Sequence, residues 1–276
     1  MTDNQTIETR LQHHYSHGTL AAAVDKSLVA LGKDPAAITV EDLAPIDEFH
    51  IGGRPASVAL FEQCAFTAGM HLLDVGSGLG GPARACAAVI GATVIGVDLT
   101  DEYVAVARQL SGRLGLGSKT TFQKGSVLDL PFADATFDGA YMIHVGMNIA
   151  DKPRLFHEVR RSLKPGAVFG IYDVMRLADG ELRFPLPWSS VAGTSFVEPP
   201  ASYRDKLAAA GFAITAKRNR HAAALEFFAQ GARREQAGQA PALFHRAPDW
   251  PLKSANLQAM LVAGIIAPVE IIARAI

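Results

Sequence analysis

A glycine-rich turn constrains this chain more than any other feature of its sequence. Residues 71–75 form a mostly apolar run typical of a buried strand, residues 76–81 read GSGLGG, and Pro82 suits the first turn of a helix. Glycine adopts positive φ and lets the backbone pass close to a ligand. The N-terminus of the following helix presents free N–H groups and a partial positive charge. The turn therefore predicts a ligand site at the end of this strand, although a turn with a purely structural role has the same pattern.

From residue 71 onward, short apolar runs alternate with helical segments. Strands are predicted at residues 71–75, 93–97, 120–123, 137–143, 168–172, 212–217 and 269–275. Helices are predicted between the strands at residues 82–90, 101–114, 153–163 and 202–210. Such an alternation predicts an α/β fold built on a parallel sheet with right-handed crossovers.

The charge balance, the cysteines and the apolar stretches indicate which partners and which cellular location to expect. The 276 residues include 26 basic and 27 acidic side chains, which give a net charge of −1 and no basic surplus for a nucleic acid. The two cysteines, Cys64 and Cys86, form neither a metal-binding spacing nor a disulfide framework, and the N-terminus lacks a signal-peptide pattern. The apolar stretch at residues 259–268 is about half as long as a membrane span. We therefore expect a cytoplasmic protein without a nucleic-acid or membrane partner.

The glycines of residues 76–81 fit two cofactor-binding patterns. The dinucleotide pattern G-x-G-x-x-G uses the first, second and fourth glycines, with Asp98 as the acid that binds a ribose. The pattern acid-x-G-x-G-x-G, typical of turns that bind S-adenosylmethionine, uses the first three glycines with Asp74 as the acid. Asp74 favours the second pattern, because a carboxylate suits a cofactor end that carries a cationic sulfonium and ammonium group. A nicotinamide-dependent oxidoreductase is the alternative.

Residues 72–80 resemble motif I of the class I S-adenosylmethionine-dependent methyltransferases, and further motifs follow in the order of that family. They are residues 94–99 as motif II, 125–132 as the loop at the adenine, 137–144 as the fourth strand and 163–166 as the turn before the fifth. The resemblance covers about residues 70–175. It implies a three-layer Rossmann-like sandwich with a seven-stranded, mostly parallel sheet, an antiparallel final strand, N-terminal helices and a helical cover.

The resemblance also implies which residues bind S-adenosylmethionine. The cofactor site comprises Asp74, Gly76, Ser77, Gly78, Gly80, Asp98, Leu99, Ser126, Val127 and His144. By this resemblance, Asp98 accepts hydrogen bonds from the two ribose hydroxyls, and Leu99 packs against the adenine. Ser126 stands where the family usually has an acid that accepts from the adenine amine, and Asp129 is a candidate substitute for that acid.

Two segments outside residues 70–175 resemble one particular branch of the methyltransferases. Residues 47–54, which read DEFHIGGR, and residues 266–272 resemble the branch of sarcosine and dimethylglycine methyltransferases. In that branch an arginine before the first strand can hold the methionyl carboxylate of the cofactor. Arg54 is the candidate here, because a guanidinium pairs with a carboxylate in a bidentate way. The alternative is a surface arginine near a turn.

We expect one methyltransferase domain with added cover. Residues 1–70 are predicted to form an N-terminal helical cap, and residues 71–276 the methyltransferase domain. Helical or irregular cover segments are expected near residues 174–203 and 220–262. A separate C-terminal helical domain is the alternative, but the β-branched density at the C-terminus favours a final strand.

Few residues are candidates for catalysis, because the sulfonium methyl group is already activated and mainly needs alignment with its acceptor. A base is needed only where the acceptor carries a proton at the working pH. The candidates are His144, at the end of the fourth strand, and His50 and Tyr15 before the first strand. Each has an alternative role as a packed or solvated side chain.

Aromatic residues mark the acceptor side. Trp188 and Phe196 either line an apolar acceptor pocket or pack beneath a loop. A lid or a subunit contact, and with the latter a homodimer, is expected from Phe227, Phe228 and Trp250.

We therefore expect an S-adenosylmethionine-dependent methyltransferase that forms S-adenosylhomocysteine and methylates a nitrogen, carbon or oxygen atom of a small molecule. No metal is expected, because the histidines of residues 13–17 are spaced loosely and lack partner acids. A methyltransferase-fold protein that binds the cofactor without turnover is the alternative from a different class.

Overall fold

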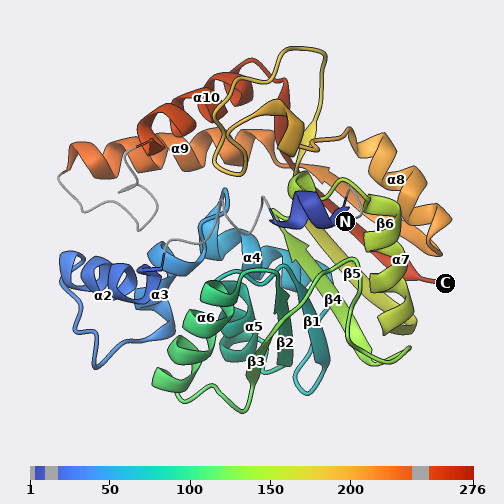
Figure 1. Cartoon of the computed structure of the whole chain (residues 1–276), viewed down its shortest axis with the longest axis horizontal. Coiled ribbons are helices and arrows are strands. Elements are labelled where there is room, and N and C mark those ends of the chain that lie inside the picture. The colour runs from blue at the N-terminus through green and yellow to red at the C-terminus, as the bar shows by residue number, and fades with distance from the viewer. Residues whose placement is uncertain (1–3, 10–17, 238–248) are drawn as a thin grey trace.

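The computed structural model describes residues 4–9, 18–237 and 249–276. They fold around a seven-stranded sheet with the strand order β3-β2-β1-β4-β5-β7-β6 (Figure 1). The strands are β1 (His71–Val75), β2 (Thr93–Asp98), β3 (Thr120–Lys124), β4 (Phe137–Ile143), β5 (Leu163–Arg176), β6 (Phe212–Asn219) and β7 (Ile266–Ala275).

The strands of the sheet are parallel except for β7, the last strand of the chain. β1 to β5 pair in parallel, whereas β7 runs antiparallel to both of its neighbours, β5 and β6. This confirms the predicted seven-stranded, mostly parallel sheet with an antiparallel final strand. The observed bounds of β1 and β4 equal the predicted ones, because each strand is a buried apolar run that stops at a turn.

The fifth strand is much longer than the sequence predicted. The expected strand covered residues 168–172, and an irregular cover segment was expected from residue 174, but β5 extends over Leu163–Arg176. β7 pairs with β5 along its whole second half and holds the end of β5 in the sheet. Val174 and Met175 are fully buried there, so the prediction of cover at these residues is wrong.

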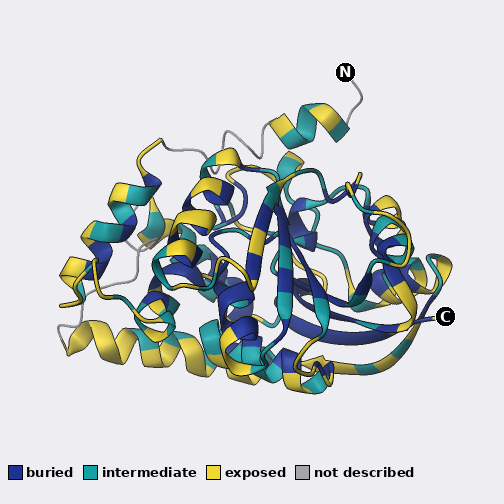
Figure 2. Cartoon of the chain, turned by 90° about the horizontal axis from the view of Figure 1, so that it is seen from below, coloured by how far each residue is buried: buried dark blue, intermediate teal, exposed yellow. Residues whose placement is uncertain are grey.

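Helices cover both faces of the sheet and complete three layers. On one face lie α4 (Gly53–Gln63), α5 (Gly81–Val89) and α6 (Asp101–Arg113), and on the other lie α7 (Lys152–Ser162) and α8 (Pro200–Ala209). Each face has its own buried apolar core. Figure 2 shows the buried strands between helices whose outer sides are exposed.

Further helices surround the carboxyl ends of the parallel strands. α2 (Leu20–Ala30) and α3 (Val40–Asp47) share an apolar core with α6. α9 (His221–Gln236) and α10 (Trp250–Val262) pack on each other across the top of the molecule in Figure 1. Short 3-10 turns, η1 (Gly146–Asn148) and η2 (Ala192–Thr194), follow β4 and β5.

Among the described residues, no helix is both long enough and apolar enough to cross a membrane. The apolar stretch at residues 259–268 is divided between the end of α10 and the start of β7. Ile266 and Ala267 are fully buried, which agrees with the expectation that this stretch belongs to the core.

Candidate cofactor and acceptor site

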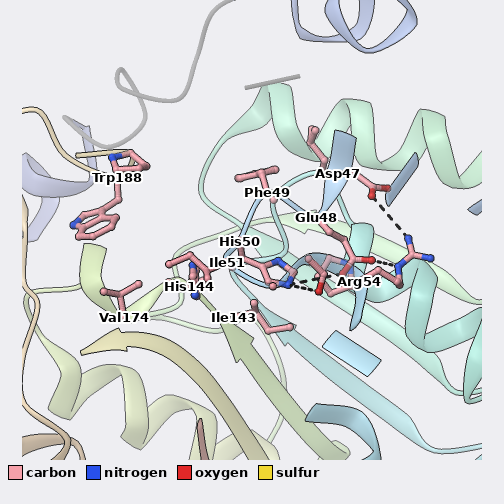
Figure 3. A pocket seen from close by; sticks show the side chains of 18 of the residues that line it. Asp47, Glu48, Phe49, His50, Ile51, Arg54, Ile143, His144, Val174 and Trp188 are labelled. Atoms are coloured by element: carbon pink, nitrogen blue, oxygen red, sulfur yellow. Dashed lines mark hydrogen bonds and ion pairs between the residues drawn. The ribbon is translucent and has the colours of Figure 1, made fainter. Parts of the chain in front are cut away.

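A cavity of about 900 Å³ lies where β1, β2 and β4 end (Figure 3). This volume is near the upper end of the ~300–1,000 Å³ typical of ligand pockets. We call one part the cofactor half, which is lined by Gly76, Ser77, Gly78, Asp98, Leu99, Ser126 and Val127. We call the other part the acceptor half, which is lined by residues between 174 and 258, including Val174, Trp188, Phe227, Phe228, Trp250 and Leu257.

The glycines of the turn differ in the structural reason that excludes a side chain. Gly76 has a φ of 78°, and a Cβ atom there would lie 2.4 Å from Val145. Gly80 has a φ of 77°, and its Cβ would lie 2.4 Å from a buried aromatic ring. Near Gly78, the nearest atom to an added Cβ is 3.5 Å away, on Phe49. The positive φ of 51° favours glycine at position 78 as well. Close packing adds a second requirement at Gly76 and Gly80, whereas Gly78 presents bare backbone to the cavity.

Asp98 connects the glycine turn to the start of α6. Its Oδ2 accepts from the N–H of Gly78 over 2.8 Å, and its Oδ1 accepts from the N–H of Thr100 over 2.9 Å. Burial raises the pKa of Asp98, and these hydrogen bonds to the carboxylate oppose that shift. The Thr100 hydroxyl and the Leu99 N–H also hydrogen-bond to Asp98. A carboxylate has about four lone-pair sites, so a ligand hydroxyl in the cavity would share these oxygens with the protein's own donors.

Asp74 lies behind the turn and does not line the cavity, in contrast to its predicted place in the cofactor site. Side chains of β1 alternate between the faces of the sheet, which puts Asp74 on the same side as Leu72, under α4 and α5. It is 2% exposed, and its Oδ2 has no hydrogen-bond partner among the described residues. Burial raises the pKa of Asp74 to about 8, so the carboxyl is largely protonated at neutral pH.

This shift predicts a pH dependence of stability. The pKa of an aspartate in the unfolded chain is ~3.9, so above this pH the unfolded chain loses a proton that folded Asp74 keeps. The stability that the neutral carboxyl contributes is therefore complete below pH ~3.9. It is lost as the pH rises through about 8. Relative to Asp74→Asn, the free energy of unfolding of the wild type should therefore fall between pH 5 and pH 8. Urea denaturation measures it, the exposed Asp134→Asn serves as control, and parallel curves for the wild type and Asp74→Asn would contradict the assignment.

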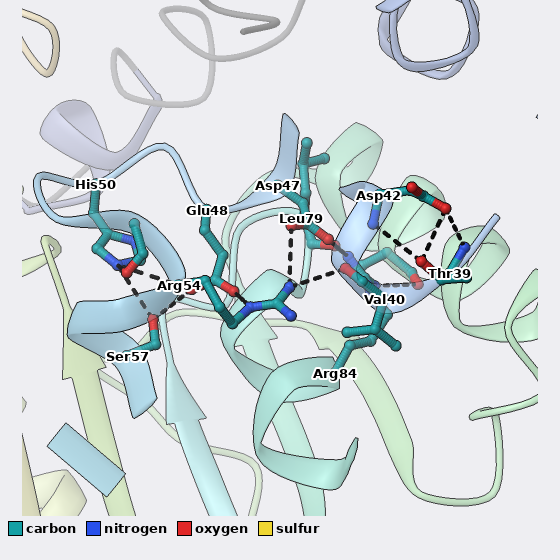
Figure 4. Close-up of polar contacts among 12 residues, drawn as sticks. Thr39, Val40, Asp42, Asp47, Glu48, His50, Arg54, Ser57, Leu79 and Arg84 are labelled. Atoms are coloured by element: carbon teal, nitrogen blue, oxygen red, sulfur yellow. Dashed lines mark hydrogen bonds and ion pairs between the residues drawn. The ribbon is translucent and has the colours of Figure 1, made fainter. Parts of the chain in front are cut away.

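Residues 47–54 are fixed to α5 by a buried network of two acids and two arginines (Figure 4). Arg84, on α5, is fully buried and donates from Nη2 to Asp47 Oδ2 over 2.7 Å. Arg54 donates from Nε to Glu48 Oε1. The four charges balance, which reduces the cost of burying them. The network holds this segment at the wall of the cavity.

Arg54 lines the cavity, but its guanidinium is already engaged. Besides the bond to Glu48, its Nη2 donates to the carbonyl of Val40 over 3.2 Å, and the side chain is 15% exposed. A cofactor carboxylate at Arg54 would have to share the guanidinium with Glu48. The role of Arg54 as carboxylate ligand stays a prediction.

Two histidines lie together at the cavity wall. The ring centroids of His50 and His144 are 5.7 Å apart, and the Tyr172 ring stacks on His144 at 5.2 Å. His50 Nε2 lies 3.1 Å from the carbonyl oxygen of Gly53 and 3.2 Å from Ser57 Oγ. A carbonyl can only accept, so this geometry assigns the hydrogen of His50 to Nε2 and leaves a lone pair on Nδ1.

Both imidazoles are neutral at pH 7. Burial lowers the pKa of His50 to about 4 and lowers the pKa of His144 well below its ordinary value. Ser57 donates to Glu48 Oε2 over 2.5 Å, so a hydrogen-bonded chain joins this carboxylate to His50. His144 has a φ of 53°, a strained conformation for a residue with a side chain, and such strain occurs at functional sites. Each neutral imidazole keeps a lone pair for a proton, but the lowered pKa makes each of them a weak base.

Sequence reasoning missed one acid at the cofactor half. Ser126 Oγ donates to the carboxylate of Glu8, which also lines the cavity. The two residues are 118 positions apart, so no local pattern links them. Asp129, the predicted substitute for the missing acid, is exposed and does not line the cavity. Glu8 thus brings a carboxylate to the place where the sequence shows only a serine.

The remaining predicted residues divide into three groups. Trp188, Phe227, Phe228 and Trp250 line the cavity, as a pocket wall or lid requires. Phe196 is absent from the cavity lining, and its carbonyl accepts from Lys152 over 2.6 Å. Tyr15 and the histidines of residues 13–17 lie outside the described residues. Within the described ranges, no group of three His, Cys, Asp or Glu side chains is arranged to hold a metal ion.

The sequence around this site matches a known family. Residues 73–171 match the family described as methyltransferase domain. The sterol 24-C-methyltransferase of Eremothecium gossypii is 37% identical over 114 residues, which are 41% of this chain and 31% of that protein. The 24-methylenesterol C-methyltransferase 2 of Oryza sativa subsp. japonica is 41% identical over 105 residues, which are 38% and 29% of the two chains. The chain thus spans about a third of the length of these relatives.

Solved structures share the fold over nearly the whole chain. The [4+2]-cyclase SpnF has a TM-score of 0.70 and 20% identity, with 97% of this chain and 96% of that chain covered. The geranyl diphosphate C-methyltransferase from Streptomyces coelicolor A3(2), in complex with Mg²⁺, geranyl diphosphate and S-adenosyl-L-homocysteine, has a TM-score of 0.71 and 17% identity, with 98% of each chain covered. This likeness concerns the fold, and a fold shared by a cyclase and a methyltransferase does not define the reaction.

Residues 73–171 match the methyltransferase domain family, and the strand order, the glycine turn and the acid at the end of β2 are those that the resemblance to class I S-adenosylmethionine-dependent methyltransferases implies. S-adenosylmethionine is the cofactor of this class. The predicted resemblance is therefore confirmed, and the curated relatives of the domain are small-molecule methyltransferases that act on sterols by name.

Proposed function

We propose that the protein transfers the methyl group of S-adenosylmethionine to a small molecule bound in the acceptor half and releases S-adenosylhomocysteine. The observation that carries this proposal is one continuous cavity that joins the Gly78–Asp98 contact to an aromatic-lined pocket. When bound, the cofactor supplies an activated methyl group. A nicotinamide-dependent oxidoreductase is not favoured, because the family match is to methyltransferases.

The chain's residues would hold the cofactor through polar groups at the cavity wall. The carboxylate of Asp98 accepts from ribose hydroxyls, and Leu99 lies beside it at the cavity wall. The carboxylate of Glu8, beside Ser126, accepts from the adenine amine. Arg54 lies at the cavity wall for the methionyl carboxylate.

Catalysis would rest mainly on alignment and exclusion of water. Orientation of two bound reactants can supply ~7–11 kcal/mol in favourable cases. Where the acceptor has a proton to lose, His50 Nδ1 can take it, because its Nε2 is fixed by Gly53 and Ser57. Glu48, 3.9 Å from His50 Nε2, then stabilises the imidazolium that forms. His144 lines the same wall and orients the acceptor.

The assignment of Asp98 has a direct test. Asp98→Ala removes a carboxylate that accepts from the ribose, which is worth about 1.5–3 kcal/mol for hydrogen bonds to a charged group. Affinity for S-adenosylhomocysteine should fall about tenfold to a hundredfold, as measured by calorimetry. The matched control is Asp101→Ala, an exposed acid three residues along that pairs with Lys124 and should bind normally. Unchanged affinity in a folded Asp98→Ala protein would place Asp98 outside the site.

The activity itself is tested with S-adenosylmethionine labelled in its methyl group and purified protein. Transfer of label to an amine, phenolic or quinone-like acceptor would support the proposal. Binding of the cofactor with no transfer to any acceptor class would favour the alternative of a protein that binds without turnover. The cytoplasmic location and the homodimer stay predictions from the sequence.

A further inference from the structure

The wall of the acceptor half is part of the protein's own apolar core. Val174 is fully buried, and Trp188 and Leu257 are 3% and 4% exposed. All three line the cavity and belong to one core cluster that joins β5, the segment after it and α10. Figure 3 shows Trp188 and Val174 at the end of the pocket away from Asp47 and Arg54. The acceptor half therefore offers rigid apolar contact.

This half offers no buried counter-charge among the described residues. Of its lining residues, Arg234 and Glu235 are charged, and both are exposed on the last turn of α9 with opposite signs. The indole N–H of Trp188 is occupied, because it donates to Ser195 Oγ over 3.0 Å. A phosphate, carboxylate or ammonium group placed against Val174, Trp188 and Leu257 would lose its hydration there without gaining a charged partner from these side chains, which is costly.

The nearest buried ions do not supply that partner. Arg84 is paired with Asp47, and Arg54 is paired with Glu48, so the network is neutral as a whole. His50 and Asn148 are uncharged polar side chains that also line the cavity. Asn148 Oδ1 is buried without a partner among the described residues, so it can accept from one donor on a bound molecule.

We infer that the acceptor is an uncharged, mainly apolar molecule whose carbon skeleton packs against Val174, Trp188 and Leu257, and that acceptors bearing a diphosphate or an amino-acid zwitterion are excluded. The inference rests on the proposed function, whose acceptor class it names. It also sets this chain apart from the branch resemblance to sarcosine and dimethylglycine methyltransferases, since those acceptors are small and charged.

Intrinsic tryptophan fluorescence reports ligand binding in the acceptor half. The chain has two tryptophans, Trp188 and Trp250, and both line the cavity. The protein, saturated with S-adenosylhomocysteine, is titrated with farnesol, with farnesyl diphosphate and with sarcosine. The first two share one carbon chain and differ in charge. Farnesol should change the emission in a saturable way, with an affinity at least tenfold higher than that of the diphosphate, and sarcosine should have no effect.

A pair of substitutions on α10 tests the location. Leu257→Lys places a cation in the buried wall and should weaken farnesol binding at least tenfold while leaving S-adenosylhomocysteine affinity unchanged. Val262→Lys, on the same helix at a position that is 73% exposed, should bind both normally. Should Leu257→Lys lower the thermal transition sharply, Phe228→Ala replaces it, because that partly buried ring lines the cavity and its loss should weaken farnesol binding severalfold.

The failures of the two proposals are distinguishable. If S-adenosylhomocysteine does not bind in calorimetry, the proposed function fails. If it binds but farnesyl diphosphate or sarcosine binds as tightly as farnesol, the inferred acceptor class is wrong. The same conclusion follows if farnesol produces no saturable change in the saturated protein, or if Leu257→Lys and Phe228→Ala both bind farnesol as the wild type does.

Discussion

Deletion of residues 265–276 should leave no folded protein. The deleted segment contains β7, which lies between β5 and β6 and pairs with both. Its Val269, Ile271 and Ile272 side chains are at most 5% exposed. Burial of three such side chains is worth about 5–9 kcal/mol, at ~1.5–3 kcal/mol each. A domain's total stability is only ~5–15 kcal/mol, and the loss of backbone pairing on both sides adds to the deficit.

Soluble yield and far-ultraviolet circular dichroism measure this outcome. Ile276→Ala is the control, because this last side chain is 73% exposed and should have little effect. A truncated protein with the thermal transition and cofactor affinity of the wild type would show that β7 is an appendage to the sheet.

Arg84→Met should destabilise the protein by about 3–5 kcal/mol, the usual cost of removing one partner of a buried ion pair. The Arg84 guanidinium is fully buried and donates to Asp47 and to the carbonyl oxygens of Leu79 and Ala107. Methionine fills much of the space, but the cation then left near Asp47 among the described residues is Arg54, 4.0 Å away.

The pH dependence of this effect follows from the carboxyl of Asp47. Burial raises the pKa of Asp47 to about 6 even with Arg84 present, so the carboxyl takes up a proton readily in the folded state. The neutral form needs no counter-charge, and stability due to it is lost as the pH rises through the folded pKa. Arg84→Met should therefore be less destabilising at pH 5 than at pH 8.

Urea denaturation of two variants measures both effects. The double variant Arg84→Met/Asp47→Asn should recover part of the lost stability at pH 8, because no unpaired charge remains buried. A double variant no more stable than Arg84→Met, with the same loss at pH 5 and pH 8, would show that packing rather than charge explains the effect.

Much of the fold could be predicted because its signals are local. The buried runs of β1 and β4 stop at turns, and their bounds are those that the apolar pattern indicates. The end of β5 was missed because its second half is held by β7, about a hundred residues later in the chain. A strand that is extended by a distant partner carries no local mark of its length.

The candidate site was predictable in part for the same reason. Gly78 and Asp98 belong to one strand–turn–helix–strand unit, and the Gly78 N–H lies 2.8 Å from Asp98 Oδ2 in the structure. Asp74 was placed in the site by its motif, whereas the structure buries its side chain under α4 and α5 instead of exposing it to the cavity. Glu8 has no local signal, because its contact with Ser126 joins segments that are far apart in the chain.

The central claim is that the cavity binds S-adenosylmethionine, and calorimetry on the full-length protein tests it most directly. S-adenosylmethionine and S-adenosylhomocysteine should both bind at one site per chain, and NAD(H) and NADP(H) should bind far more weakly or not at all. Clearly tighter binding of a nicotinamide cofactor than of S-adenosylhomocysteine would contradict the assignment.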